Sequence, residues 1–292
     1  MPLFRRLPSA AVAVVAFLGA AAATAECLSD AQVAVLASSY EARTPAPTPA
    51  GLSEADAACT RDKFNAWLAQ RHGKVIGYKA GLTSTAVQQR FHYDKPVWGK
   101  LYQGMVLANG ATVDAAFGAR PLFEADLLVR VRDARINSAR TPAEVLASID
   151  RIIPFIEMPD LVVESPLQLD GPGVAAINVG ARLGVAGAPI AIPKLRAERY
   201  ALLDALRDMA VVVSDGSGAT LAQGRGSDIL GHPLNAVIWI ADALQRENLA
   251  LQPGDVVSLG SFSPLMPPRP GQSISVRYDG LPGAAPVRAS FR

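Results

Sequence analysis

The chain has little of several features that mark common classes of protein. Its 28 basic and 26 acidic residues nearly balance, and no stretch gathers charge of one sign. Aromatic residues make up only 6% of the chain, and they are not interleaved with basic clusters. A nucleic-acid partner is therefore not expected, because it would need a basic surface to meet its phosphates. After residue 25 no apolar run is long enough to span a bilayer, so we expect no stable membrane insertion of the mature protein.

The first 25 residues have the pattern of a secretory signal peptide. Arg5 and Arg6 provide a basic start, residues 10–25 carry no charge, and Ala23 and Ala25 are the small residues of a cleavage site. We expect cleavage after Ala25 and a secreted or periplasmic protein, with a retained anchor as the alternative. Cleavage would remove two basic residues and leave 26 of each sign, so the mature chain is neutral overall.

Cysteine is scarce, with only Cys27 and Cys59 in the whole chain. Two cysteines in an exported protein predict one disulfide. It would close a loop of about 30 residues and stabilise the fold by roughly 3–4 kcal/mol. Two free thiols are the alternative, and a zinc site is disfavoured because no histidine lies at ligand spacing.

The pattern of apolar residues predicts helices first and strands afterwards. Residues 29–43 and 53–73 have helical spacing and are separated by a proline-rich break. Beyond residue 73, many short strands with few helices favour an α+β fold with a mixed, largely antiparallel sheet core. The expected organisation is a signal peptide (1–25), an N-terminal helical region (26–73) and a catalytic domain (74–292).

Two later segments carry specific expectations. Residues 173–184 (GVAAINVGARLG) are apolar and predict a further strand. Residues 232–249 give the strongest helix pattern in the chain, with Pro233 placed in the first turn, where a missing N–H costs least.

Three carboxylates stand out because they occur in apolar surroundings. Glu124 and Asp126 lie two positions apart in FEADLLVRV, so in a strand both side chains point to one face. Glu157 lies inside IIPFIEMPDLVV, where a buried acid needs a cation, a donor or a metal. The ordinary interpretation of the pair is a solvated strand face, and that of Glu157 is a salt bridge to Arg130, Arg132 or Lys79. The alternative is a Mg²⁺ or Mn²⁺ site built from hard oxygen ligands.

One lysine and three histidines complete the set of candidate site residues. Lys79 lies between two glycines in IGYKAGLT, where it is either a surface residue or a group that moves protons or holds an anion. The histidines His72, His92 and His232 fit no metal spacing, and His232, between a glycine and a proline, is expected to be structural.

Four stretches resemble, in the same order, the 2-keto-4-pentenoate hydratases of the fumarylacetoacetate hydrolase superfamily. The first contains GYKAGLT and the helix and turn that follow it, and the second is the LFEADLLVRV strand. The third is GHPLNAVIWIADAL, and the fourth is the C-terminal stretch that contains PGDVVSLGSFSP and SISVRYDG. The resemblance covers roughly residues 74 to 290.

The resemblance implies a metal-dependent hydro-lyase. By position, Glu124, Asp126 and Glu157 would bind Mg²⁺ or Mn²⁺, and Glu124 and Lys79 would be catalytic. The ion would act as a Lewis acid that stabilises the enolate of a small 2-oxo or 2-hydroxydienoic acid. Water would then add to the enone that the dienol forms.

The resemblance also assigns the substrate contacts. Lys79 would assist proton transfer or bind the enolate oxygen, and Ser261 and Ser263 match the loop that holds the substrate carboxylate. Members of this superfamily often assemble into oligomers, so a homo-oligomer is compatible with the resemblance.

Some positions depart from the family pattern. Asp126 stands where a second glutamate is usual, and PDLVVESPLQLDGPGVAAINVG replaces the segment that commonly follows Glu157. Asp160 and Asn178 are the candidates to replace the polar groups lost there. The alternatives are therefore a C–C hydrolase or decarboxylase of the same superfamily, or an exported protein that binds a carboxylate without turnover.

Overall fold

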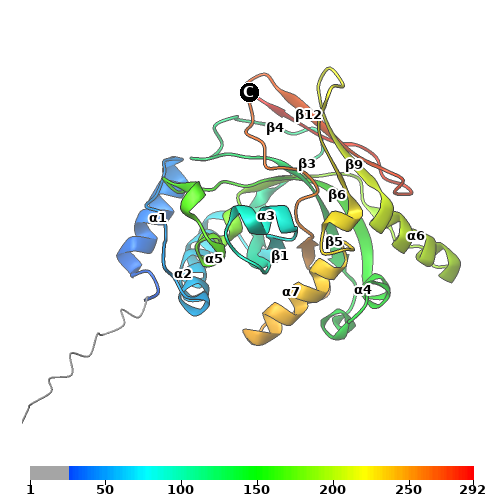
Figure 1. Ribbon diagram of the computed structural model, residues 1–292, viewed down its shortest axis with the longest axis horizontal. Coiled ribbons are helices and arrows are strands. Elements are labelled where there is room, and N and C mark those ends of the chain that lie inside the picture. The colour runs from blue at the N-terminus through cyan, green and yellow to red at the C-terminus, as the bar shows by residue number, and fades with distance from the viewer. Residues whose placement is uncertain (1–25) are drawn as a thin grey trace, which may run out of the picture.

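The computed structural model describes residues 26–292, so the expected signal peptide lies outside the described residues. Two helices, α1 (Asp30–Ala42) and α2 (Glu54–His72), begin this part of the chain. Each begins with a capping box, in which the hydroxyl of Ser29 or Ser53 accepts from a backbone N–H of the first turn. Figure 1 shows both helices together at one side of the molecule, so the helices predicted before residue 74 are present.

The rest of the chain is built around two sheets. The larger has eight strands in the order β2-β1-β11-β5-β6-β7-β3, with β8 paired to β6, and the smaller has five in the order β10-β9-β12-β13-β4. Among the described strands, three pairs are parallel, β1 with β11, β3 with β7 and β4 with β13, and the other pairs are antiparallel. The predicted α+β fold with a largely antiparallel core is confirmed.

The bounds of the strands are as follows. The larger sheet contains β1 (Val75–Gly81), β2 (Val97–Tyr102), β3 (Val106–Ala108), β5 (Glu124–Val131), β6 (Ile149–Met158), β7 (Leu183–Ala186), β8 (Ile190–Ala191) and β11 (Val256–Ser258). The smaller sheet contains β4 (Thr112–Val113), β9 (Ala210–Asp215), β10 (Thr220–Arg225), β12 (Ser273–Asp279) and β13 (Val287–Phe291).

Five more helices flank the sheets, namely α3 (Thr85–Arg90), α4 (Pro142–Ser148), α5 (Gly171–Ala176), α6 (Arg196–Asp208) and α7 (Asn235–Arg246). Helix α4 contacts both α6 and α7, and Figure 1 shows α4 and α6 on the side away from α1 and α2. The largest apolar cluster joins the two sheets, for example through Val129 of β5 and Val213 of β9. A second cluster packs Phe64 and Leu68 of α2 against Leu101 of β2, so the N-terminal helices share a core with the strands.

Two local predictions are wrong. Residues 173–184 form the end of α5, the 3₁₀ turn Asn178–Gly180 and the start of β7 instead of one strand. The reason is a local cap, because the Asp170 carboxylate accepts from the Gly173 N–H (2.8 Å) and thereby begins a short helix. In addition, Pro233 precedes α7, which begins at Asn235, so the proline is not in its first turn.

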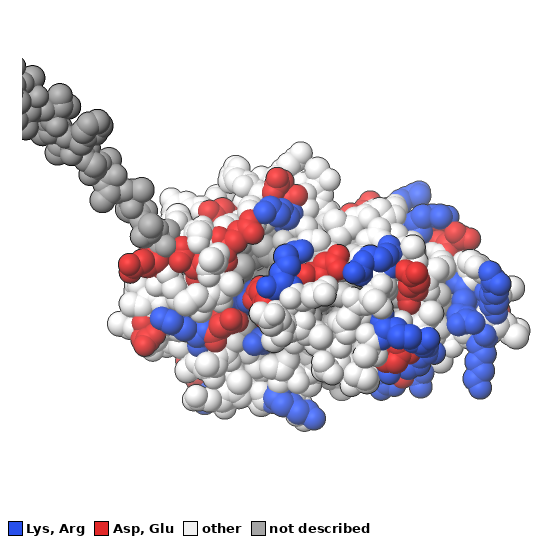
Figure 2. Space-filling view, turned by 90° about the horizontal axis from the view of Figure 1, so that it is seen from below, with Lys and Arg blue, Asp and Glu red and all other residues white. Residues whose placement is uncertain are grey.

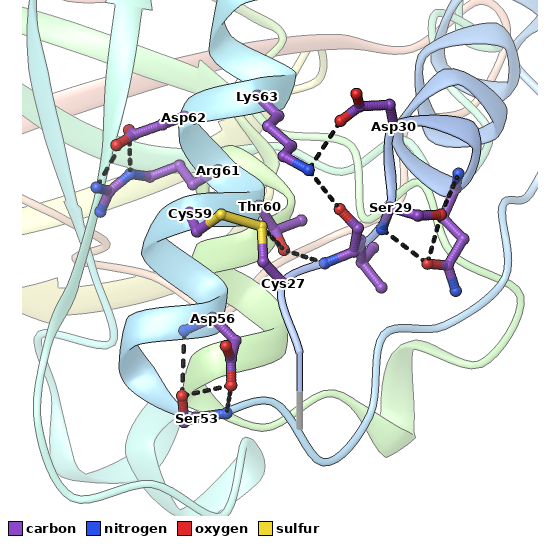
Figure 3. The surroundings of a disulfide bond; sticks show 12 residues. Cys27, Ser29, Asp30, Ser53, Asp56, Cys59, Thr60, Arg61, Asp62 and Lys63 are labelled. Atoms are coloured by element: carbon purple, nitrogen blue, oxygen red, sulfur yellow. Dashed lines mark hydrogen bonds and ion pairs between the residues drawn. A yellow bond between two sulfur atoms is a disulfide. The ribbon is translucent and has the colours of Figure 1, made fainter. Parts of the chain in front are cut away.

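The structure joins Cys27 and Cys59 in a disulfide with an S–S distance of 2.10 Å and a Cα–Cα distance of 5.7 Å. Figure 3 shows that this bond fixes the segment before α1 to the side of α2. Beside it, the Leu28 N–H donates to the Thr60 hydroxyl at 3.0 Å. The Lys63 ammonium of α2 donates to the Leu28 carbonyl at 3.1 Å and pairs with Asp30, so the start of the described chain is held by the disulfide together with several polar contacts.

On the face seen in Figure 2, basic and acidic side chains are interspersed over the middle and left, and basic side chains predominate at the right-hand end. No helix among residues 26–292 has the length and apolar character needed to cross a membrane.

Candidate functional site

Strand pairing brings the predicted acidic residues together. Antiparallel β5 and β6 place Glu124 directly opposite Glu157, and Asp126 lies two residues further along β5. The exposed fractions are 8% for Glu124, 0% for Asp126 and 1% for Glu157. The interpretation of the Glu124–Asp126 pair as a solvated strand face is therefore wrong, because buried carboxylates need compensation from within the protein.

Lys79 of β1 provides part of this compensation. Its side chain is as deeply buried as those of the acids, and its ammonium forms an ion pair with Glu157 Oε1. The same ammonium donates to the carbonyl oxygen of Val179 at 2.9 Å. The second oxygen, Glu157 Oε2, is buried without a hydrogen-bond partner. The predicted salt bridge of Glu157 is thus made by Lys79, while Arg130 pairs with Asp150.

Asp126 is held by donors from the segment after β11. Its carboxylate accepts from the Ser258 hydroxyl and from the backbone N–H groups of Leu259 and Gly260, both at 3.1 Å. The N–H of Leu127 is a further donor at 2.6 Å. Ser258 was missed in the sequence, although a single polar residue inside the apolar run DVVSLG is a recognisable signal.

The charges of the site are out of balance. Burial, and next the neighbouring Glu157, raise the pKa of Glu124 well above its ordinary value. The same two causes raise the pKa of Asp126 to about 8. Three carboxylates face a single ammonium, so full ionisation leaves negative charge that nothing in the described residues neutralises.

A divalent cation fits this deficit of positive charge, and the unpartnered Glu157 Oε2 is an oxygen available to it. As the side chains stand, however, no group of three or more His, Cys, Asp or Glu residues within the described part of the chain is arranged as a ligand set. In this arrangement Lys79 contacts one oxygen of Glu157, and the Ser258 hydroxyl contacts the Asp126 carboxylate. Glu157 Oε2 is therefore the oxygen open to an ion, whereas both oxygens of Asp126 already accept hydrogen bonds, so binding a metal requires these side chains to rearrange.

A small cavity of about 50 Å³ adjoins these groups. Lys79, Glu124 and Ser261 are among its lining residues, together with a largely apolar wall that includes Leu82, Thr83, Val87, Phe91, Leu161, Val174, Val179 and Leu265. A larger cleft of about 810 Å³ shares Thr83, Val87, Ser261 and Leu265 with it. The cleft thus adjoins the inner cavity.

The two predicted serines have different positions. Ser261 lines the inner cavity, and its hydroxyl lowers the pKa of the adjacent Glu124, against the larger effect of burial. Ser263 accepts from the Ala125 N–H at 3.0 Å and donates to the Pro264 carbonyl. The Ser263 side chain therefore attaches the loop to β5, while the Ser261 side chain lines the cavity and its hydroxyl donates to the Ser263 carbonyl oxygen.

The other polar candidates contact the protein scaffold. Asp160 accepts from the N–H of Arg120 (2.7 Å) and pairs with Arg182 (3.1 Å). Asn178 pairs with the backbone of Lys100. Neither side chain lines the inner cavity. His232 contacts the Leu203 carbonyl at 3.1 Å, in agreement with the structural role expected for it.

No protein-family model matches the chain. It is 30% identical over 232 residues to 2-keto-4-pentenoate hydratase 2 of Dechloromonas aromatica (strain RCB), which covers 79% of this chain and 84% of the relative. It is 28% identical to a 4-oxalocrotonate decarboxylase of Pseudomonas putida, over 73% of this chain and 76% of the relative. A solved 4-oxalocrotonate decarboxylase from Pseudomonas putida, complexed with magnesium and adipate, superposes with a TM-score of 0.77 at 26% identity, covering 92% of this chain and 100% of that one.

Proposed function

The chain belongs to the 2-keto-4-pentenoate hydratase family of the fumarylacetoacetate hydrolase superfamily, and from this premise we propose that it is a metal-dependent hydro-lyase. Its substrate is a small 2-oxo or 2-hydroxydienoic acid such as 2-keto-4-pentenoate. The observation that carries the proposal is the set of three buried carboxylates and one buried lysine beside a small cavity. Such a concentration of buried ionisable groups is costly for stability and is typical of a functional site.

Mg²⁺ or Mn²⁺ is the proposed cofactor, held by Glu124, Asp126 and Glu157. The ion would neutralise the two negative charges that Lys79 leaves uncompensated. When bound, it supplies Lewis-acid stabilisation of the negative charge that develops on the 2-oxo oxygen. The magnesium in the solved decarboxylase supports a divalent ion for this chain as well.

The residues of the cavity have separate roles in substrate binding and proton transfer. Lys79 has three N–H donors, of which Glu157 and the Val179 carbonyl take two, so one remains for a substrate oxygen or for proton transfer. The Ser261 hydroxyl lines the cavity and donates to the Ser263 carbonyl oxygen, so it would have to leave that carbonyl to donate to the substrate carboxylate. Ser263 contributes to substrate binding by holding the Ser261 loop against β5. The apolar lining of the cavity disfavours bulk water around the substrate.

The composition of the inner cavity favours hydration over decarboxylation of a dicarboxylate. Lys79 is the only cation among its lining residues, and the remaining wall is largely apolar. A second carboxylate inside this cavity would therefore lose its hydration without gaining a partner, because Arg90 lines only the outer cleft. An uncharged hydrocarbon tail, as in 2-hydroxypenta-2,4-dienoate, matches the wall.

A substrate comparison tests this proposal. Mature protein with Mg²⁺ or Mn²⁺ should consume 2-hydroxypenta-2,4-dienoate and form the 4-hydroxy-2-oxo product, and it should act slowly on 4-oxalocrotonate. Chelation of the metal should abolish turnover, and the change Lys79→Ala should reduce it to a small but measurable residual rate. Release of carbon dioxide from 4-oxalocrotonate as the faster reaction would establish the decarboxylase instead. Binding without turnover of either compound would establish a carboxylate-binding protein.

We also propose that the protein is exported. The signal-peptide pattern of residues 1–25 and the disulfide support this location. Fractionation of cells should recover the protein outside the cytoplasm, starting at Glu26. Recovery of a full-length cytoplasmic protein would contradict the proposal.

A further inference from the structure

An unusual backbone turn lies next to Lys79. Asn178, Val179 and Gly180 have consecutive positive φ angles of 53°, 54° and 64°. Glycine adopts this left-handed region freely and asparagine tolerates it, but a β-branched valine is a genuine outlier there. Such conformations persist only where the surroundings enforce them, and they occur often at functional sites.

The Asn178 side chain is the group that enforces the turn. Its Oδ1 accepts from the Lys100 N–H at 2.7 Å, and its Nδ2 donates to the Lys100 carbonyl at 3.0 Å. Asn178 is completely buried against β2, and a Cβ atom added at Gly99 would lie 2.6 Å from the Asn178 carbonyl oxygen. The turn is thus fixed to the strand next to β1, on which Lys79 lies.

The turn presents two groups to the site. The Val179 carbonyl oxygen accepts from the Lys79 ammonium at 2.9 Å, and the Val179 side chain lines the inner cavity. Val179 also lies against β1, because a Cβ atom added at Gly81 would be 2.4 Å from its Cγ1. A relaxed turn would move the carbonyl and leave Lys79 with Glu157 as its one remaining partner in the described protein.

We propose that Asn178 is a positioning residue for Lys79. It holds the Asn178–Gly180 turn against Lys100, so that the Val179 carbonyl directs the Lys79 ammonium and its remaining donor towards the cavity. This inference rests on the proposed function, in which that donor meets the substrate. Asn178 itself does not touch the substrate.

A set of variants separates positioning from a merely structural role. Asn178→Ala should lower kcat about 10- to 100-fold while KM changes little, because a displaced catalytic group is costly even when binding persists. Asn178→Asp keeps the acceptor for the Lys100 N–H and tolerates the left-handed backbone, so it should recover part of the activity. The double variant Lys79→Ala/Asn178→Ala should be no slower than Lys79→Ala alone, since both changes remove the same function.

Asn137 provides a matched control. Its side chain also clamps backbone groups, donating to the Leu251 carbonyl and accepting from the Leu251 N–H, both at 2.9 Å, and it does not line the cavity. Asn137→Ala should lower the unfolding temperature and leave kcat of the folded protein unchanged. Equal losses of kcat in Asn137→Ala and Asn178→Ala, or independent effects of Asn178→Ala and Lys79→Ala, would overturn the proposal.

A crystal structure of Asn178→Ala keeps the inference testable if the proposed reaction is wrong. The expected result is that Lys79 Nζ has left the Val179 carbonyl oxygen. If Nζ remains at its wild-type position, Asn178 does not position Lys79, whichever reaction the wild type catalyses. Failure of the wild type to turn over any dienoate, with Lys79 displaced in the variant, would reject the proposed function and retain the positioning role.

Discussion

At the scale of single residues, the central feature of the site is the buried ion pair between Lys79 and Glu157. Their exposed fractions are 3% and 1%, and they form an ion pair inside the protein. A buried pair gains little net stability, but the loss of one partner leaves an uncompensated charge. Lys79 is thus required for stability in the metal-free protein as well as for the proposed chemistry.

The change Lys79→Met should therefore lower the free energy of unfolding by about 3 kcal/mol or more. Lys79→Met/Glu157→Gln should recover much of this loss, because it removes the orphaned charge together with its partner. Urea denaturation in chelator measures both variants. Equal stability of the single and double variants would show that the ion pair does not compensate Glu157.

Ser258 is a second residue whose effect is predictable. Its hydroxyl donates to the buried Asp126 carboxylate, so Ser258→Ala removes one of the donors that hold this acid. The expected loss of stability is about 1 to 3 kcal/mol, the usual cost of leaving a buried polar group short of a partner. Thermal unfolding against wild type measures it, and an unchanged midpoint would show that backbone donors alone suffice for Asp126.

At the scale of elements, the disulfide makes a separate prediction. It joins residues 32 positions apart and fixes the segment before α1 to α2. Cys59→Ser should lower the free energy of unfolding by about 3 kcal/mol, because the reduced chain has more conformational freedom when unfolded. Wild type treated with reductant is the control and should match the variant. Unaltered stability of both would mean that packing of α2 alone holds this region.

A comparison of the helices and strands with the sequence shows which structural features local patterns predict. The strand carrying Glu124 and Asp126 and the capped helix at Ser53 follow from local alternation and capping signals. Residues 173–184 were wrongly expected to be a strand, because a short apolar run fits either structure. The contact of Lys79 with Glu157 depends on the order β1-β11-β5-β6, which unites strands far apart in the sequence. No local pattern specifies that order, so the contact could only be offered as one of three alternatives.

At the scale of the whole molecule, the site combines residues that lie far apart in the sequence. Lys79 comes from near the start of the catalytic region, the acids from its middle and Ser258 from its last quarter. The N-terminal helices pack against the same structure, and the Arg61 guanidinium of α2 pairs with Glu247, beyond the end of α7. The strands that carry the site thus also form part of the core that the N-terminal helices complete.

The most direct test of the central claim is a calorimetric titration of Mn²⁺, followed by oxalate, into metal-free mature protein and into Glu124→Gln/Glu157→Gln. The amide variant keeps the shape of both side chains but leaves the buried Lys79 ammonium without its ion-pair partner, so circular dichroism first establishes that the variant is folded. The account predicts that wild type binds Mn²⁺ and then oxalate, and that the variant binds neither measurably. Failure of wild type to bind Mn²⁺, or equal affinity in the variant, would contradict a metal site at these carboxylates.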